Sequence, residues 1–64
     1  MNQEKIGTFL KELRREKNMT QEQLSEKLNV NNRTISRWEN ARTMPDFDMM
    51  IELAKLYDVT IEEL

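Results

Sequence analysis

The chain of 64 residues contains no cysteine and no histidine. These two absences exclude disulfides, thiolate catalysis, zinc fingers and most other metal sites, because thiolates and imidazoles supply that chemistry. We therefore expect neither a metal nor a cofactor. The lack of cysteine also fits a protein that works in a reducing compartment.

The sequence has a single glycine and a single proline, which leaves little room for strands and tight turns. Glutamate, lysine, leucine, glutamine, arginine and methionine, which are good helix formers, are abundant. No apolar run approaches the ~18 residues of a membrane span, and the first ten residues lack the features of a signal peptide. The expected fold is all-α, in one domain over residues 1–64.

The formal net charge of −2 is unevenly distributed along the chain. Residues 1–20 hold five basic and three acidic side chains (+2), and residues 31–44 hold three and one (+2). Residues 21–30 sum to −1, and residues 45–64 hold six acids against one lysine (−5). Such polarity can steer one face of a protein toward phosphate, although solvated helix faces explain the pattern equally well on charge alone.

The spacing of apolar residues predicts three helices in the first forty residues. A stripe that begins at Ile6 predicts a helix over about residues 2–17, and Thr20 with Gln23 forms a capping-box pattern that starts a second, short helix. Asn29-Val30-Asn31 predicts a turn, in which Asn29 has a left-handed backbone and Asn31 caps a third helix over residues 32–39. That third helix buries Ile35 and Trp38.

The last third of the chain predicts one long helix and the start of another. Residues 40–44 form a loop, Pro45-Asp46 begins the fourth helix, and Asp58-Val59 ends it. Thr60 and Glu63 repeat the capping-box pattern, so we expect a fifth helix there. Met19 and Met50 are expected in the core, where methionine fills gaps.

The third predicted helix has an outward face that suits double-stranded DNA. With Ile35 and Trp38 inward, the polar residues Asn32, Arg33, Ser36 and Arg37 point outward. Arginine makes bidentate contacts with guanine and asparagine with adenine in the major groove. Thr34, Ser36 and the helix N-terminus can bond phosphate oxygens. Taken alone, the two arginines would be an ordinary solvated face; two short helices joined by a three-residue turn favour DNA contact.

The middle of the chain resembles the Cro and phage-repressor helix-turn-helix family. The resemblance is carried by Thr20-Gln21-Glu22-Gln23-Leu24-Ser25-Glu26-Lys27-Leu28, then Val30, then Thr34-Ile35-Ser36-Arg37-Trp38-Glu39-Asn40. Pro45, Leu53-Ala54 and the segment from Ile6-Gly7 to Leu13-Arg14 extend the resemblance over about residues 5–64. It implies a compact five-helix, lambda-repressor-like domain with the helix-turn-helix at its second and third helices. The implied function is sequence-specific binding of double-stranded DNA by a transcriptional regulator, in particular a repressor.

The resemblance also implies roles for individual residues. Base-reading positions are occupied by Asn32, Arg33 and Arg37, and phosphate-contacting or positioning sites by Gln21, Thr34, Asn40 and Arg42. Arg14 and Glu39 correspond to a buried pair between the first and third helices. Three glycines of the family pattern are replaced, by Asn29, Ala41 and Asp58. Alanine tolerates a left-handed backbone only at a cost of about 1 kcal/mol, so the loop at Ala41 is expected to differ.

The expected partner is a pseudo-palindromic operator bound by a homodimer in the bacterial cytoplasm, with these residues forming the N-terminal part of a longer regulator. The alternative is a protein-binding module or antitoxin-like adaptor, for which the acidic residues 45–64 would serve. Salt-dependent binding to duplex DNA would separate the two. An enzyme is not expected. The sequence has carboxylates, but it has no histidine, no cysteine, no glycine-rich phosphate-binding loop and no cluster of metal ligands to act with them.

Overall fold

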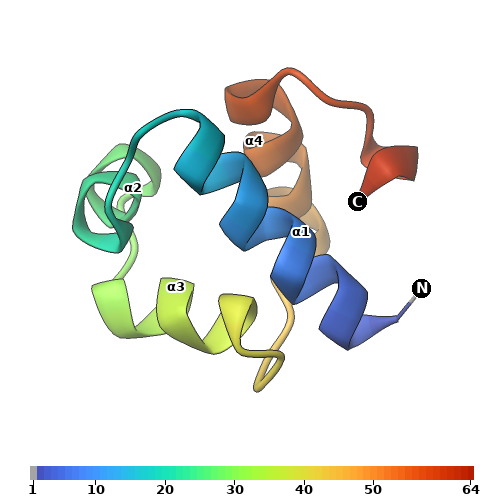
Figure 1. The fold of residues 1–64 in the computed structure, drawn as a ribbon, viewed down its shortest axis with the longest axis horizontal. Coiled ribbons are helices and arrows are strands. Elements are labelled where there is room, and N and C mark those ends of the chain that lie inside the picture. The colour runs from blue at the N-terminus through green and yellow to red at the C-terminus, as the bar shows by residue number, and fades with distance from the viewer. Residues whose placement is uncertain (1) are drawn as a thin grey trace.

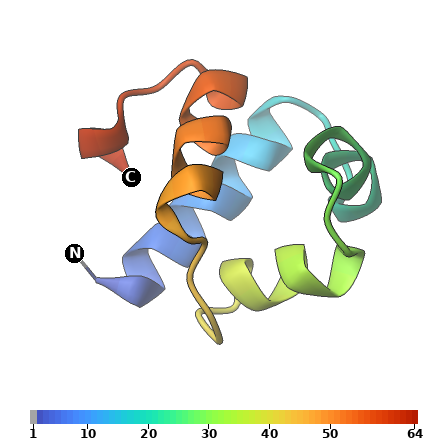
Figure 2. The ribbon, with the colours of Figure 1, turned by 180° about the vertical axis from the view of Figure 1, so that it is seen from behind.

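The computed structural model describes residues 2–64, so Met1, the first residue of the expected domain, lies outside it. These residues form four α-helices and a short 3-10 helix, arranged as in Figures 1 and 2: α1 (Gln3–Glu16), α2 (Gln21–Leu28), α3 (Asn32–Glu39), α4 (Phe47–Tyr57) and η1 (Ile61–Glu63). No strand occurs within this range. None of the helices there has the length and apolar character needed to cross a membrane.

Short polar side chains fix where the helices begin. Asn2 caps α1 by accepting from the backbone amides of Glu4 and Lys5, at 2.9 and 3.1 Å. Thr20 and Gln23 form the expected capping box at α2, in which each side chain accepts from the backbone amide of the other residue. These bonds satisfy amides that have no partner inside the helix, so the helices start where the caps stand.

The later helices are capped in the same way. Asn31 caps α3, as expected, by accepting from the Arg33 amide at 2.7 Å. Asp46 caps α4 by accepting from the Met49 amide at 2.9 Å. The start and end of α3 therefore agree with the sequence prediction.

The expected fifth α-helix is not present in the described chain. Residues Ile61–Glu63 form a 3-10 turn, and the Thr60 side chain makes no capping hydrogen bond. The interpretation of Thr60 and Glu63 as a capping box was therefore wrong. Leu64, which follows this turn, is buried against the core, with only 5% of its surface exposed. Its burial holds the segment in place.

Among residues 2–64, four residues other than glycine have a left-handed backbone: Asn18, Asn29, Ala41 and Asp58, with φ between 55° and 59°. Asn29 and Asp58 follow the last residues of α2 and α4, where this conformation ends a helix. Ala41 keeps the same conformation in the loop after α3. At the three positions where the resemblance implies glycine, this chain thus keeps the backbone that glycine favours.

All four α-helices contribute to the core, and α2 packs at one end of α3 (Figures 1 and 2). Leu24, Ile35 and Leu53, from three different helices, are its most deeply buried side chains. Met50 is buried as expected, whereas Met19 is only partly buried. This packing holds one side of α3 inside the molecule and leaves its other side on the surface.

Candidate nucleic-acid interface

The turn between α2 and α3 is short and internally bonded. Asn29 adopts φ 57° and ψ 45°, and its amide donates to the Glu26 carbonyl at 3.4 Å. The Val30 amide donates to the Ser25 carbonyl at 3.0 Å, which completes the helix C-terminus. Asn31 then caps α3. Three residues therefore set the angle between the two helices, which is the arrangement of a helix-turn-helix.

The two sides of α3 differ in character. Ile35 and Trp38 face the core, with 0% and 6% of their surface exposed. Asn32, Arg33 and Arg37 are exposed, whereas Ser36 is half-buried among them. Shallow surface hollows follow this outer side, lined by Gln21, Asn31, Asn32, Arg33 and Ser36 near the start of α3 and by Arg33, Ser36, Arg37, Asn40 and Arg42 near its end.

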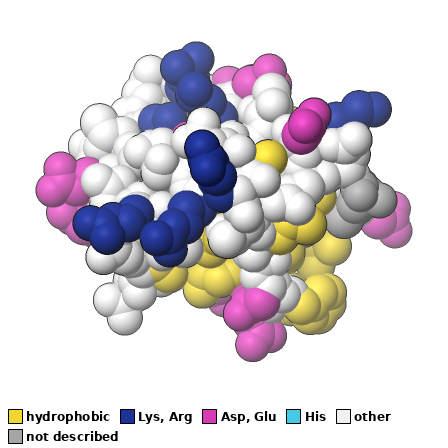
Figure 3. Space-filling model, turned by 90° about the horizontal axis from the view of Figure 1, so that it is seen from below, with side chains coloured by type: hydrophobic (Ala, Val, Ile, Leu, Met, Phe, Trp, Pro, Cys, Tyr) yellow, Lys and Arg dark blue, Asp and Glu magenta, His cyan; other side chains and the backbone are white. Residues whose placement is uncertain are grey.

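This outer side carries positive charge, concentrated around one hollow. Arg33, Arg37 and Arg42 line one hollow, and no acidic side chain lines it. Figure 3, which views the molecule from the side of α3, shows basic side chains in a row with acidic side chains around it rather than within it. Within residues 2–64 none of these three arginines forms a salt bridge. Their guanidinium groups are therefore available to an anionic partner.

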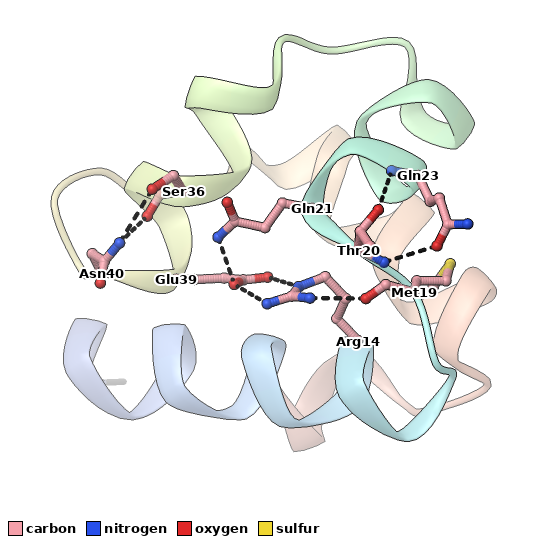
Figure 4. Close-up of polar contacts among 8 residues, drawn as sticks. All are labelled: Arg14, Met19, Thr20, Gln21, Gln23, Ser36, Glu39 and Asn40. Atoms are coloured by element: carbon pink, nitrogen blue, oxygen red, sulfur yellow. Dashed lines mark hydrogen bonds and ion pairs between the residues drawn. The ribbon is translucent and has the colours of Figure 1, made fainter.

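The one acidic residue of α3 is turned inward, into a buried ion pair (Figure 4). Arg14 donates through Nε to Glu39 Oε2 at 2.7 Å and through Nη2 to Glu39 Oε1 at 3.0 Å. Its remaining nitrogen, Nη1, donates to the Met19 carbonyl at 2.8 Å. The hydrogen bond that Arg14 donates to Glu39 raises the pKa of Arg14 above its usual value, against the effect of burial.

This pair connects α1 to the C-terminal end of α3, as the resemblance implies, and the bond to Met19 extends it to the segment before α2. A bidentate arginine–carboxylate pair fixes both distance and orientation. Removing one partner of such a buried pair leaves an uncompensated charge and costs about 3–5 kcal/mol. The pair therefore holds α3 in one position relative to the rest of the domain.

Gln21 joins the same network, which the sequence did not indicate. Its Nε2 donates to Glu39 Oε1 at 3.1 Å. The resemblance assigns Gln21 to phosphate, yet the structure directs its amide nitrogen toward Glu39 (Figure 4). Gln21 also lines the hollow near the start of α3, so it reaches the surface between the two helices.

The remaining expected residues lie on α3 and in the loop that follows it. Thr34 is half-buried and Arg42 is exposed in the loop, where its amide donates to the Arg37 carbonyl at 2.8 Å. Asn40 is exposed, but its side chain is bonded to Ser36. Gln3 Nε2 donates to the Ala41 carbonyl at 2.8 Å and so ties this loop to α1. Sequence reasoning missed the last two contacts.

No group of three or more acidic side chains in the described part of the chain is arranged to hold a metal ion. The buried carboxylate of Glu39 is already occupied by Arg14 and Gln21. The basic outer side of α3 and the loop that follows it, by contrast, offer guanidinium groups that are exposed and, among the described residues, unpaired.

Comparison with known proteins gives concordant matches. The profile of the helix-turn-helix family matches residues 10–64. The HTH-type transcriptional activator BcrR of Enterococcus faecalis is 44% identical over 55 residues, which cover 86% of this chain and 27% of that protein. The HTH-type transcriptional regulator ImmR of Bacillus subtilis is 37% identical over 59 residues, or 92% of this chain and 46% of that protein.

A third relative, the uncharacterized HTH-type transcriptional regulator YobD of Bacillus subtilis, is 34% identical over 53 residues, or 83% of this chain and 47% of that protein. The chain thus spans less than half the length of each of these relatives. The matched segment contains α2, the turn and α3 in full. On this combination of fold, network and sequence match, the chain belongs to the helix-turn-helix family of Cro and phage-repressor type.

Proposed function

We propose that this domain binds double-stranded DNA in a sequence-specific manner, with the outer side of α3 in the major groove, and that it regulates transcription. The observation that carries the proposal is the exposed row of Arg33, Arg37 and Arg42 beside Asn32, on a helix whose opposite side is fixed in the core. An α-helix fits the major groove, and DNA is the polyanion that such a helix can read.

The proposed division of labour follows from position on the helix. Arg33 and Arg37 lie four residues apart on the outer side, where bidentate contact with guanine is possible, and Asn32 can bond adenine. Arg42, in the loop, and Thr34, beside the outer side, would contact the phosphate backbone. Gln21 would do so through the amide N–H that is not used in its bond to Glu39. Base contacts give specificity, whereas phosphate contacts give position and affinity.

A DNA-binding regulator can either repress or activate transcription. One relative is named an activator, so membership of the family does not decide the direction. Repression needs only occupancy of a DNA site that polymerase must also use, and a small domain can provide that unaided. We therefore propose repression, in the bacterial cytoplasm where the chromosome lies.

Selection of binding sites from random duplex DNA, followed by alanine variants, tests the proposal. Arg33→Ala and Arg37→Ala should each cost about 1–3 kcal/mol on the selected site and relax the preference at one base pair. Arg42→Ala should weaken binding to selected and random duplexes alike and reduce the salt dependence by about one ion. Lys55→Ala, on the exposed side of α4, is the matched control for loss of one positive charge.

If neither Arg33→Ala nor Arg37→Ala changes the preferred bases, α3 is not the reading helix. The second candidate function, a protein-binding adaptor, would then lead. It is favoured by Phe47 and Met44, two large apolar side chains near each other in the sequence that remain exposed, at 68% and 41% of their surface. An adaptor would show no salt-dependent binding to duplex DNA at all.

A further inference from the structure

Ser36 has a central place on the outer side of α3. It lies one turn after Asn32 and one turn before Asn40, and it lines both hollows on this side. Its side chain is short and half-buried, whereas the flanking Arg33 and Arg37 are exposed. A partner that fits between the arginines would therefore approach the Ser36 hydroxyl directly.

Asn40 holds Ser36 through its side chain (Figure 4). The Asn40 Nδ2 atom donates to the Ser36 carbonyl oxygen at 2.8 Å and to the Ser36 hydroxyl oxygen at 3.2 Å. The carbonyl can only accept, so the amide must present its nitrogen to Ser36 and its oxygen elsewhere. The Asn40 backbone amide donates to the same carbonyl at 3.0 Å, which fixes the residue at the end of α3.

These bonds decide what each side chain can offer to DNA. Phosphate oxygens accept hydrogen bonds, so Asn40 could contact them only through the same Nδ2 that is already bonded to Ser36. The Ser36 hydroxyl accepts from Asn40 and donates to no acceptor within residues 2–64. Its hydrogen is therefore free to point outward, into the space between the hollows.

We infer that Ser36 is a specificity-determining residue that donates its hydroxyl hydrogen to a base edge, and that Asn40 is a positioning residue that acts through Ser36. This inference rests on the proposed DNA binding and departs from the phosphate roles that were expected for both residues. The ligand is a hydrogen-bond acceptor in the major groove: purine N7, guanine O6 or thymine O4.

The inference predicts which base is excluded. Cytosine offers only its amino group in the major groove, and that group is a donor. One of the two lone pairs of the Ser36 oxygen accepts from Asn40. With its hydrogen pointing outward, the hydroxyl would place a donor against the amino group of cytosine. At the base beside Ser36, the selected site should accept guanine, adenine or thymine in the contacted strand and disfavour cytosine.

The experiment measures dissociation constants of the wild-type chain, Ser36→Ala, Asn40→Ala and the double variant. Each is measured on the selected duplex, on the three single-base changes at each position, and on a random duplex. Ser36→Ala keeps the carbonyl that Asn40 contacts at 2.8 Å, so it removes only the hydroxyl. Thr60→Ala is the matched control, because it removes an exposed hydroxyl that caps nothing. Thr60 directly precedes η1, a segment that lies away from α3 in Figures 1 and 2.

Ser36→Ala should weaken binding to the selected duplex about two- to tenfold, the usual effect of one neutral hydrogen bond, and leave the random duplex unchanged. It should also admit cytosine at one position. Asn40→Ala should shift the same position in the same direction, and should have no further effect on base preference in the Ser36→Ala background. Circular dichroism of each variant establishes that it is folded.

Three outcomes would overturn the inference. Asn40→Ala could weaken selected and random duplexes by one factor, which would make Asn40 a phosphate contact. Ser36→Ala could leave every base preference unchanged while Arg33→Ala and Arg37→Ala each alter one. This result would show that the arginines contact bases and that Ser36 does not. If the wild-type chain binds no duplex DNA, the proposed function fails together with the inference.

Discussion

Ala41 keeps a left-handed backbone, φ 59°, that its Cβ atom makes unfavourable. Ala41→Gly should therefore raise the free energy of unfolding by about 0.5–1 kcal/mol, because the strain relieved exceeds the added flexibility of the unfolded chain. Asn29→Gly, at φ 57°, should change stability by less than about 0.5 kcal/mol, since asparagine tolerates this region. Urea denaturation of both variants checks the difference. Equal effects at both positions would contradict the assigned strain.

The Tyr57 side chain places a polar hydroxyl group in the apolar core. Its hydroxyl is buried without a hydrogen-bond partner among residues 2–64. Burial, with a further effect from the Glu39 charge, raises the pKa of Tyr57 to about 12, from 10.0. Below pH 10 the folded and unfolded chains both keep the proton, so this group adds no pH dependence there.

Between pH 10 and 12 the unfolded chain releases the Tyr57 proton while the folded chain keeps it, so the free energy of unfolding must fall. The loss should reach about 2–3 kcal/mol by pH 12. Tyr57→Phe should lack this loss and be at least as stable as wild type at pH 7, because it removes an unsatisfied hydroxyl. Urea denaturation of wild type and Tyr57→Phe between pH 10 and 12 isolates the effect of Tyr57, since the lysines titrate in both proteins. If the free energy of unfolding falls equally with pH in both, Tyr57 does not cause the loss.

At the scale of elements, Gly7 sets how closely α1 approaches α3. A Cβ atom at this position would lie 2.7 Å from the Trp38 carbonyl oxygen and 2.9 Å from that of Glu39. Both are backbone atoms at the end of α3, so Gly7→Ala must push the helices apart. The free energy of unfolding should fall by about 1–3 kcal/mol, despite alanine's better helix propensity. Thr8→Ala, at the exposed neighbouring position, should leave the free energy of unfolding almost unchanged. If thermal unfolding shows that both variants lose similar stability, Gly7 does not set the distance between α1 and α3.

The sequence predicted the helices well because their ends depend on local chemistry. Thr20 with Gln23 and Asn31 each bond an amide within three residues, so a sequence pattern is enough to place them. The same reasoning failed at Thr60, whose side chain makes no cap. There the buried Leu64 and a single 3-10 turn determine the backbone, and tertiary packing is not visible in a local pattern.

The surface of α3 was predictable in composition but not in its hydrogen bonds. Helical periodicity alone places Arg33 and Arg37 outside and Trp38 inside. The bond from Gln21 to Glu39 joins two helices, and its direction depends on the angle between them. Asn40 and Ser36 are four apart, a spacing that permits contact, but serine and asparagine have many alternative partners, so spacing alone could not identify the pair.

On the scale of the whole molecule, charge is separated in space as well as along the chain. The acidic last third forms α4 and η1, which lie away from the outer side of α3 in Figures 1 and 2. A chain of net charge −2 can therefore still present a basic surface to a polyanion. The acidic side would repel DNA and so favour one orientation of approach.

The size of the domain limits how much DNA one copy can read. Its longest extent is 26 Å, which spans only about seven or eight base pairs at about 3.4 Å each. Seven fully specified base pairs distinguish about 16,000 sequences, whereas a genome offers about 10⁶–10⁹ competing sites. We therefore predict that two copies bind a two-fold symmetric site whose half-sites lie about 34 Å apart, one helical turn, on one face of the duplex.

Hydroxyl-radical footprinting on the selected duplex should show two protected half-sites with this spacing. Inserting about five base pairs between them turns one half-site to the opposite face and should abolish joint occupancy. Inserting about ten restores the face and should weaken joint occupancy less, because only the separation has changed. Protection of one half-site at saturating protein, or equal effects of the two insertions, would show that each copy binds alone; specificity would then have to come from sequence-dependent DNA shape beyond the contacted base pairs.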